Sequence, residues 1–192
     1  KILTNATIIF ALFQTAFSSV ISNSEYNFQI NFASGSGWDI PDILTESQSG
    51  LNPPLKYLIN SKHAEGCKFI FSVMEHKNGG SFNDPESKSN FKEGFLKDLP
   101  EPFTAVTEKS GVVDGIPSYD IIADSFYKNS SVRIRQIVVS ANYHIYSLMS
   151  LSENNVPFRD SDFNEVISTF KFLNKPTITK SSGTKSNGLA FN

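Results

Sequence analysis

The chain has 192 residues, with 17 Lys and Arg against 19 Asp and Glu. A chain of this length is expected to form one domain. Its formal net charge of −2 excludes a strongly basic nucleic-acid binder and a strongly acidic disordered chain. The single cysteine excludes an intrachain disulfide and a thiolate zinc finger. With 17 Phe and 6 Tyr, the chain has ample material for one hydrophobic core.

The first segment has the layout of a secretory signal peptide. A basic residue precedes an apolar run over residues 6–13, and small and polar residues follow it. The pattern predicts cleavage after Ser22, or alternatively after Ser18. A membrane-spanning helix would need about 20 predominantly apolar residues, and polar residues interrupt this run. We therefore expect a signal peptide over residues 1–22, a secreted or periplasmic protein, and no stable membrane anchor after cleavage.

The rest of the chain divides into a folded domain and a tail. Residues 174–192 are rich in Ser, Thr, Lys, Asn and Gly and have no apolar period, which predicts a disordered tail. The domain is accordingly expected over residues 23–173.

Alternating polar and apolar residues predict a series of strands in this domain. The strands are expected over residues 26–32, 67–74, 103–109, 119–123, 132–139 and 143–151. The last two flank a hairpin turn at Ser140-Ala141-Asn142. Residues 55–59 are expected to form a strand or a turn, and residues 41–54 a loop.

Two segments have the spacing of amphipathic helices. Phe91, Phe95 and Leu99 form one apolar stripe over residues 85–99, and a second stripe runs through residues 161–172. Runs of strands with two helices well separated in sequence predict an α+β layered domain.

Several motifs together resemble the Mog/PsbP-like superfamily, in particular its exported DcrB-like and PsbP-related small domains. The similar parts are the opening strand Tyr26–Ile30 with Gly37-Trp38, the turn Val113–Tyr119, and the closing helix Phe163–Phe172. The resemblance implies an α+β fold in which an antiparallel β-sheet is sandwiched by helices. It also implies a binding or assembly role without catalytic residues. The lipid-attachment cysteine of the lipoprotein members is missing here.

Four residues are candidates for ligand binding. Arg133 and Arg135 share one face of a predicted strand, where they could receive a carboxylate or phosphate; alternatively, they belong to a solvated face with cross-strand partners. Trp38 and Tyr143 could line a partner-binding groove, because large aromatic residues are enriched at interfaces. The alternative is that these rings belong to the core and its rim.

Three residues are weak candidates for a metal site. His63 and Cys67 lie four residues apart, and His76 follows the same predicted strand, so zinc or copper is geometrically possible. The alternative is a polar loop entering a strand, with Cys67 as a small buried hydrophobic residue. We assign no metal and expect no cofactor.

The sequence contains no nucleophile elbow, no phosphate-binding loop, no dinucleotide-binding glycine motif and no H-E-x-x-H motif. It therefore favours an exported non-enzymatic protein that binds an unknown protein partner or envelope component and no nucleic acid. The alternative is a periplasmic or secreted protein that binds a small ligand or a metal. A hydrolase with a site dispersed over several loops ranks below both.

Overall fold

The computed structural model describes residues 18–45, 54–77, 80–97, 99, 103–127, 130–153 and 156–178. In these residues the chain forms ten strands and two helices. The strands are β1 (Ser19–Asn23), β2 (Phe28–Phe32), β3 (Asp42–Thr45), β4 (Leu55–Lys62), β5 (Lys68–Glu75), β6 (Phe103–Val113), β7 (Ile116–Tyr127), β8 (Ser130–Ala141), β9 (His144–Glu153) and β10 (Lys171–Phe172). The helices are α2 (Pro85–Lys97) and α3 (Asp160–Thr169).

A seven-stranded sheet forms the centre of the fold, with the order β3-β4-β5-β9-β8-β7-β6. Each pair of neighbouring strands in it is antiparallel. In β5 the residues at positions 69, 71 and 73 are buried on one face, as the period-two alternation of its sequence predicts.

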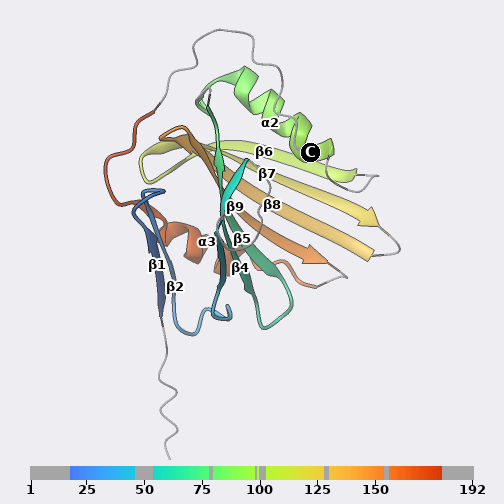
Figure 1. The fold of residues 1–192 in the computed structure, drawn as a ribbon. Coiled ribbons are helices and arrows are strands. Elements are labelled where there is room, and N and C mark those ends of the chain that lie inside the picture. The colour runs from blue at the N-terminus through green and yellow to red at the C-terminus, as the bar shows by residue number, and fades with distance from the viewer. Residues whose placement is uncertain are drawn as a thin grey trace, which may run out of the picture.

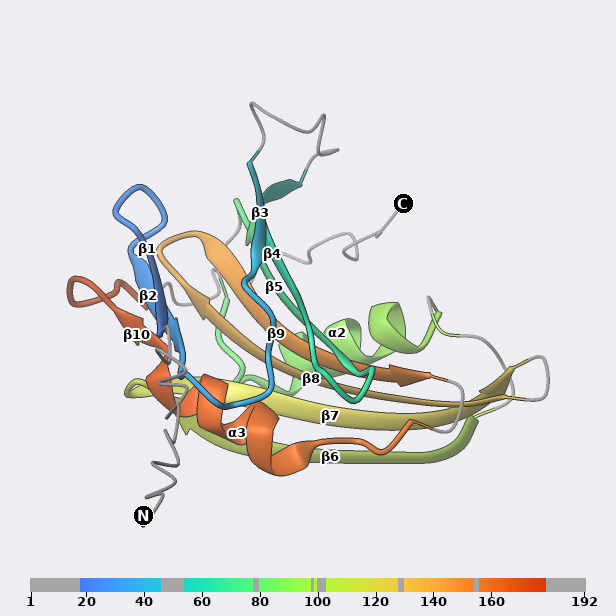
Figure 2. The same ribbon diagram turned by 90° about the horizontal axis from the view of Figure 1, so that it is seen from below.

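A second sheet of three strands, in the order β1-β2-β10, packs beside α3 on one face of the large sheet (Figures 1 and 2). Its inner residues Phe28, Ile30 and Phe32 are buried against β5 and α3. On the opposite face, α2 inserts Phe91 and Phe95 into a separate apolar cluster. The layers are therefore α2, the large sheet, and the small sheet with α3.

The predicted fold class is wrong. The described chain is mainly β, with two sheets and two helices, and it is not an antiparallel sheet sandwiched by helices. Several strands of the large sheet are longer than expected, and two short strands complete a second sheet that was not expected at all. The sequence pattern places β1 in the signal peptide and β10 in the closing helix, although Phe170 and Phe172 alternate with Lys171 as a strand requires.

Most of the other predicted elements are confirmed. The helix expected over residues 85–99 is α2, and the hairpin expected over residues 132–151 is β8 and β9. The segment 55–59 is a strand and extends to Lys62. The predicted loop over residues 41–54 is wrong for residues 42–45, which form the short edge strand β3; residues 46–53 lie outside the described part.

The predicted signal peptide falls partly outside the described residues, since residues 1–17 are not described. Residues 19–23 form β1, which pairs with β2 from Ser19 opposite Phe32 to Asn23 opposite Phe28. Cleavage after Ser22 would remove most of this strand, whereas cleavage after Ser18 would leave it whole.

Three hairpin turns hold the segment that follows α3. Their residues Asn27, Asp114 and Asn142 have positive φ angles of 55°, 47° and 53°, a conformation that Asn and Asp tolerate better than most residues. Their side-chain oxygens accept hydrogen bonds from backbone N–H groups of that segment. The N–H of Phe172 donates to Asp114 at 2.7 Å, that of Asn174 to Asn27 at 2.7 Å, and that of Thr177 to Asn142 at 2.8 Å.

We call residues 172–178 the C-terminal strap. We call the end of the fold where the strap crosses these three hairpin turns the turn end. The strap includes the first five residues of the predicted tail, and residues 179–192 lie outside the described part. The β1–β2 turn belongs to the small sheet, and the β6–β7 and β8–β9 turns belong to the large one. The strap therefore connects the two sheets where the hairpins reverse.

Replacing Asp114 by Ala tests the contribution of this strap. The substitution removes the acceptor for the Phe172 N–H and places Ala at a positive φ. We expect the free energy of unfolding to fall by about 1–2 kcal/mol in a chemical denaturation experiment.

Asp114→Asn is the matched control, because it keeps a side-chain acceptor and a residue type that tolerates positive φ. Its stability should stay within about 0.5 kcal/mol of the parent. Equal losses in both variants would contradict this role of the side-chain oxygen.

Candidate functional site

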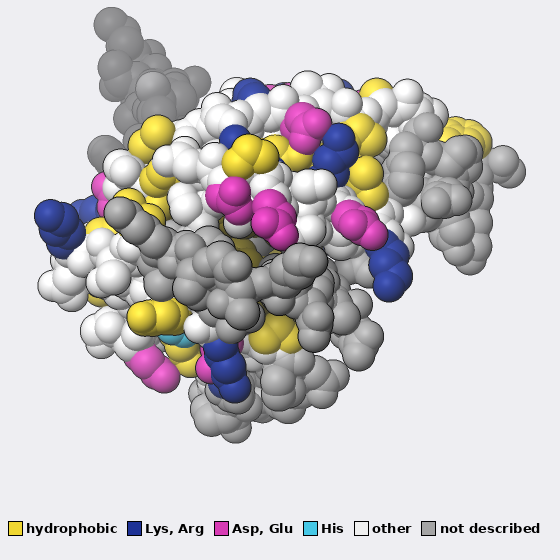
Figure 3. Space-filling view, turned by 90° about the horizontal axis from the view of Figure 1, so that it is seen from above, with side chains coloured by type: hydrophobic (Ala, Val, Ile, Leu, Met, Phe, Trp, Pro, Cys, Tyr) yellow, Lys and Arg dark blue, Asp and Glu magenta, His cyan; other side chains and the backbone are white. Residues whose placement is uncertain are grey.

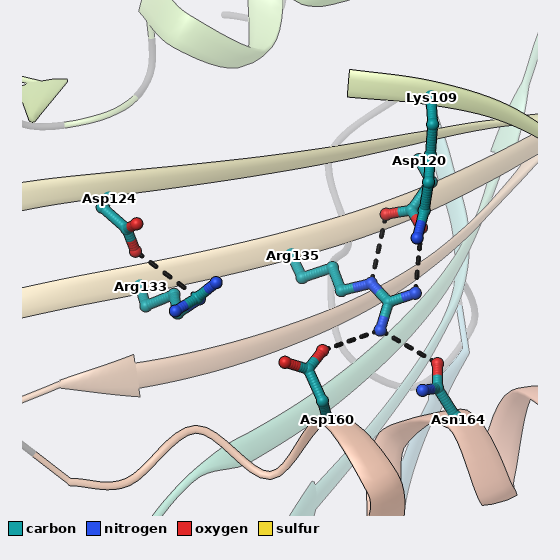
Figure 4. Close-up of polar contacts among 7 residues, drawn as sticks. All are labelled: Lys109, Asp120, Asp124, Arg133, Arg135, Asp160 and Asn164. Atoms are coloured by element: carbon teal, nitrogen blue, oxygen red, sulfur yellow. Dashed lines mark hydrogen bonds and ion pairs between the residues drawn. The ribbon is translucent and has the colours of Figure 1, made fainter. Parts of the chain in front are cut away.

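Arg135 of β8 is used inside the protein. Its Nε and Nη2 donate to the two carboxylate oxygens of Asp120 at 3.1 and 2.9 Å (Figure 4). Its Nη1 donates to Asp160 at 2.8 Å and to Asn164 at 2.9 Å, both on α3. The Arg135 side chain is only 7% exposed. The guanidinium therefore joins the first turns of α3 to the large sheet.

The charges around Arg135 suit this structural role. Burial disfavours the charged guanidinium, but Asp120 and Asp160 outweigh burial and raise the pKa of Arg135. Lys109 adds a second cation 3.4 Å from Asp120. The carboxylate of Asp120 is thus compensated on two sides, as a buried ion requires.

Arg133 lies on the same strand face and forms a separate pair (Figure 4). Its Nε is 3.5 Å from a carboxylate oxygen of Asp124, and its side chain is 43% exposed. The guanidinium also lies over the ring of Phe158, 5.4 Å from the ring centroid. The structure does not bring the two arginines to one common partner among the described residues.

Trp38 packs against His63 beside the first turn of α3, where its Nε1 donates to the carbonyl oxygen of Asp162 at 3.4 Å. The two rings meet edge to face with their centroids 5.0 Å apart. His63 Nε2 lies 3.2 Å from both Asp162 and the carbonyl oxygen of Ser36, and His63 Nδ1 accepts the N–H of Glu65 at 3.1 Å. Both nitrogens of His63 are therefore engaged within the protein.

Two of the three weak metal candidates lie at the turn between β4 and β5, where the N–H of His63 donates to the carbonyl oxygen of Cys67 at 2.7 Å. Cys67 is fully buried, and burial raises the pKa of its thiol. His76 lies beyond the far end of β5, where burial lowers its pKa. Across the described segments, no group of three or more His, Cys, Asp or Glu side chains could hold a metal ion.

Tyr143 occupies an unusual position at the turn end. It follows Asn142 in the two-residue turn between β8 and β9, and its φ is 60°. Hairpin turns of this kind favour Gly at that position, because a bulky residue with positive φ is strained. Two backbone hydrogen bonds hold the turn in this form: the N–H of His76 donates to the carbonyl oxygen of Tyr143 at 2.7 Å, and the N–H of Asn142 donates to that of Thr177 at 2.9 Å. The tyrosine side chain is 53% exposed, so its own burial does little to offset the strain, and a bulky residue at such a position is a candidate functional residue.

A pocket of about 460 Å³ lies beside this turn. It is lined by residues from the β1–β2 turn, from β4, from the end of β5 and from the β8–β9 turn: Glu25, Tyr26, Lys56, Glu75, Lys77, Tyr143 and His144. Sheet pairing places Glu75 opposite His144, and the small sheet brings the β1–β2 turn to the same place. We take this pocket, which we call the turn pocket, as the candidate functional site.

One wall of the turn pocket is held firmly. The backbone N–H of Tyr26 donates to Asn23 at 2.9 Å, and its carbonyl oxygen accepts the hydroxyl of the buried Tyr146 at 2.9 Å. The Tyr26 ring meets His144 edge to face at 5.6 Å. Because these contacts fix the backbone of Tyr26, its ring is positioned before any ligand arrives.

The charges in the turn pocket balance one another. Glu75 lies 3.8 Å from Lys56 and 3.9 Å from Lys77. His144 Nδ1 lies 2.7 Å from the carbonyl oxygen of Asn142, so this nitrogen carries the proton and Nε2 is the acceptor in the neutral ring.

On the side of the molecule that bears α2, acidic and basic side chains are likewise interspersed (Figure 3).

Sequence reasoning named only one residue of the turn pocket in advance, Tyr143. The others come from segments far apart in the chain, and only the packing of the two sheets brings them together. The usable signal was Asn142-Tyr143, a hairpin turn with a tyrosine where glycine is usual.

No protein-family model matches the chain, and no curated protein is significantly similar to it. Among solved structures, the chain is similar to a protein of unknown function from Pseudomonas aeruginosa for which a regulatory role has been suggested. The two share 10% sequence identity with a TM-score of 0.39, and the alignment covers 77% of this chain and 87% of the other.

Replacing Arg135 by Leu should be strongly destabilising, because it leaves the buried carboxylate of Asp120 without its main partner. We expect a loss of about 3–5 kcal/mol in the free energy of unfolding. Arg133→Leu on the same strand face is the control and should cost at most about 1 kcal/mol, because its ion pair is partly exposed. Similar losses in the two variants would argue against the internal role of Arg135.

Tyr143→Gly should raise the free energy of unfolding by about 0.5–1 kcal/mol, because glycine relieves the strain of the positive φ. Tyr143→Ala removes the ring but keeps the strain, so it should be less stable than Tyr143→Gly by about 1 kcal/mol. Thermal or chemical denaturation of the two variants side by side measures the difference. Equal stability would show that the backbone at this turn is not strained.

Proposed function

We propose that the protein is an exported, non-enzymatic binding protein that holds a partner protein or an envelope component at the turn pocket. The observation that carries the proposal is Tyr143, an exposed aromatic residue kept at a strained turn position beside the pocket. Exposed aromatic rings on a fixed backbone are typical of binding sites.

Export is part of this proposal and is supported by the predicted signal peptide. Of the two predicted cleavage positions, Ser18 fits the fold better, because cleavage there keeps the pairing of β1 with β2. The proposed location is secreted or periplasmic. Neither α2 nor α3 has the length and apolar character that crossing a membrane requires.

The binding role rests on the exposed ring of Tyr143 and not on the composition of the turn pocket, because glutamate, lysine, tyrosine and histidine side chains can each take part in catalysis. A relationship to Mog/PsbP-like proteins is part of the proposal only through the sequence motifs, since the helix-sandwiched fold that the resemblance implied is wrong.

Binding of a small ligand is the second candidate function. It is favoured by the volume of the turn pocket, about 460 Å³, which lies within the range of about 300–1,000 Å³ usual for ligand sites. A metal as that ligand has less support, because His63 is engaged within the protein and Cys67 is buried.

Site-specific photo-crosslinking in intact exporting cells of the native host tests the proposal. A benzophenone amino acid replaces Tyr143, and the matched control carries it at Phe126, another aromatic residue of similar exposure, 48%, on β7. Benzophenone inserts into C–H bonds of proteins and glycans alike. We expect a discrete adduct from position 143 that is absent from position 126. No adduct at position 143, or equal adducts at both positions, would contradict a binding role for the turn pocket.

A further inference from the structure

We propose that the turn pocket binds a neutral, polyhydroxylated ligand, namely an oligosaccharide. This inference rests on the proposed function, whose site it shares, and it names the ligand class. Three observations on the described lining carry it: its balanced charges, its aromatic rings and its lack of aliphatic residues.

The charged groups of the pocket favour a neutral ligand. Two glutamates and two lysines line it, and Glu75 lies within 3.9 Å of both Lys56 and Lys77. An ionic ligand that approaches Glu75 or these two lysines would meet a charge of its own sign beside the opposite one, so it would gain little net attraction there. A hydroxyl group both donates and accepts hydrogen bonds, so it can pair with carboxylate oxygens and with ammonium groups at the same time.

The aromatic groups supply the apolar contacts that a sugar ring needs. The C–H groups on one face of a sugar carry slight positive charge, and an aromatic face is negative. Tyr26 has a fixed backbone, and Tyr143 stands exposed at the rim. His144 adds a ring between them, whose Nε2 is an acceptor for a ligand hydroxyl.

The same lining argues against a peptide that would insert an apolar side chain into the pocket. Protein partners anchor on large side chains that enter well-packed, fully desolvated pockets. The described lining of the turn pocket consists of charged residues, tyrosines and one histidine, without an aliphatic side chain. A hydrated, polar ligand that packs one flat face against a ring suits this surface better.

The test uses the whole exported protein on an array of immobilised neutral and acidic oligosaccharides, followed by calorimetric titration with the neutral oligosaccharide that binds best. We expect binding to at least one neutral oligosaccharide that persists when sodium chloride is raised to about 0.5 M, because an uncharged ligand is not screened by salt. Tyr143→Gly should weaken this binding at least about tenfold. The control Phe126→Ala, on the surface of β7, should leave the affinity within about twofold of the parent.

Three results would overturn the inference: no neutral oligosaccharide is bound, only acidic oligosaccharides are bound, or Tyr143→Gly binds as well as the parent. Because Tyr143→Gly is expected to be fully folded, loss of binding in it cannot come from unfolding, and its denaturation curve checks this. A protein adduct at position 143 in the crosslinking experiment, together with a blank array, would refute the oligosaccharide and leave the proposed binding role in place.

Discussion

The packing of phenylalanine rings between the two sheets is the interaction on which the rest of this structure depends. Phe28 of the small sheet is fully buried and lies 4.6 Å from Phe71 of the large sheet, measured between ring centroids. Phe32 meets Phe69 edge to face, with the ring centroids 5.2 Å apart. Burying one such ring stabilises a fold by about 1.5–3 kcal/mol, and a three-stranded sheet has little stability without a surface to cover. The small sheet therefore exists because the large one offers it this aromatic face.

The candidate site is a consequence of that packing. Tyr26 belongs to the turn of the small sheet, and Tyr143 and His144 belong to a turn of the large one, so the turn pocket forms only when the sheets are joined. The C-terminal strap strengthens the same junction, because it bonds to turns of both sheets. Arg135 acts at a different place, where it holds α3 on the large sheet. The packing of the two sheets and the strap position the backbone of the site, and the ring of Tyr143 is exposed.

Local patterns predicted most of the large sheet and little of the small one. The strand β5, the hairpin β8–β9 and the helix α2 are long and periodic, so their sequences alone identify them. β1 and β10 are short, and each adjoins a segment with a stronger pattern of another kind, the apolar run of the predicted signal peptide and the stripe of α3. Of the candidate residues, Arg135 was recognisable from its strand pattern as a polar residue on the same face as Arg133. Its partners on α3 lie 25 and 29 residues away in the sequence, so no local pattern could predict them. Tyr143 was named as a large aromatic residue of the kind that is enriched at interfaces, and its strained turn position became visible only in the structure.

Amide hydrogen exchange of the exported protein tests the central claim, that β1 pairs with β2 in a second sheet over the core. If β1 pairs with β2 as described, the mature chain begins at or before Ser19, and amides in Ser19–Asn23 and Phe28–Phe32 are protected together. A mature chain that begins at Asn23, or Ser19–Asn23 amides that exchange as fast as those of an unfolded peptide, would contradict the account.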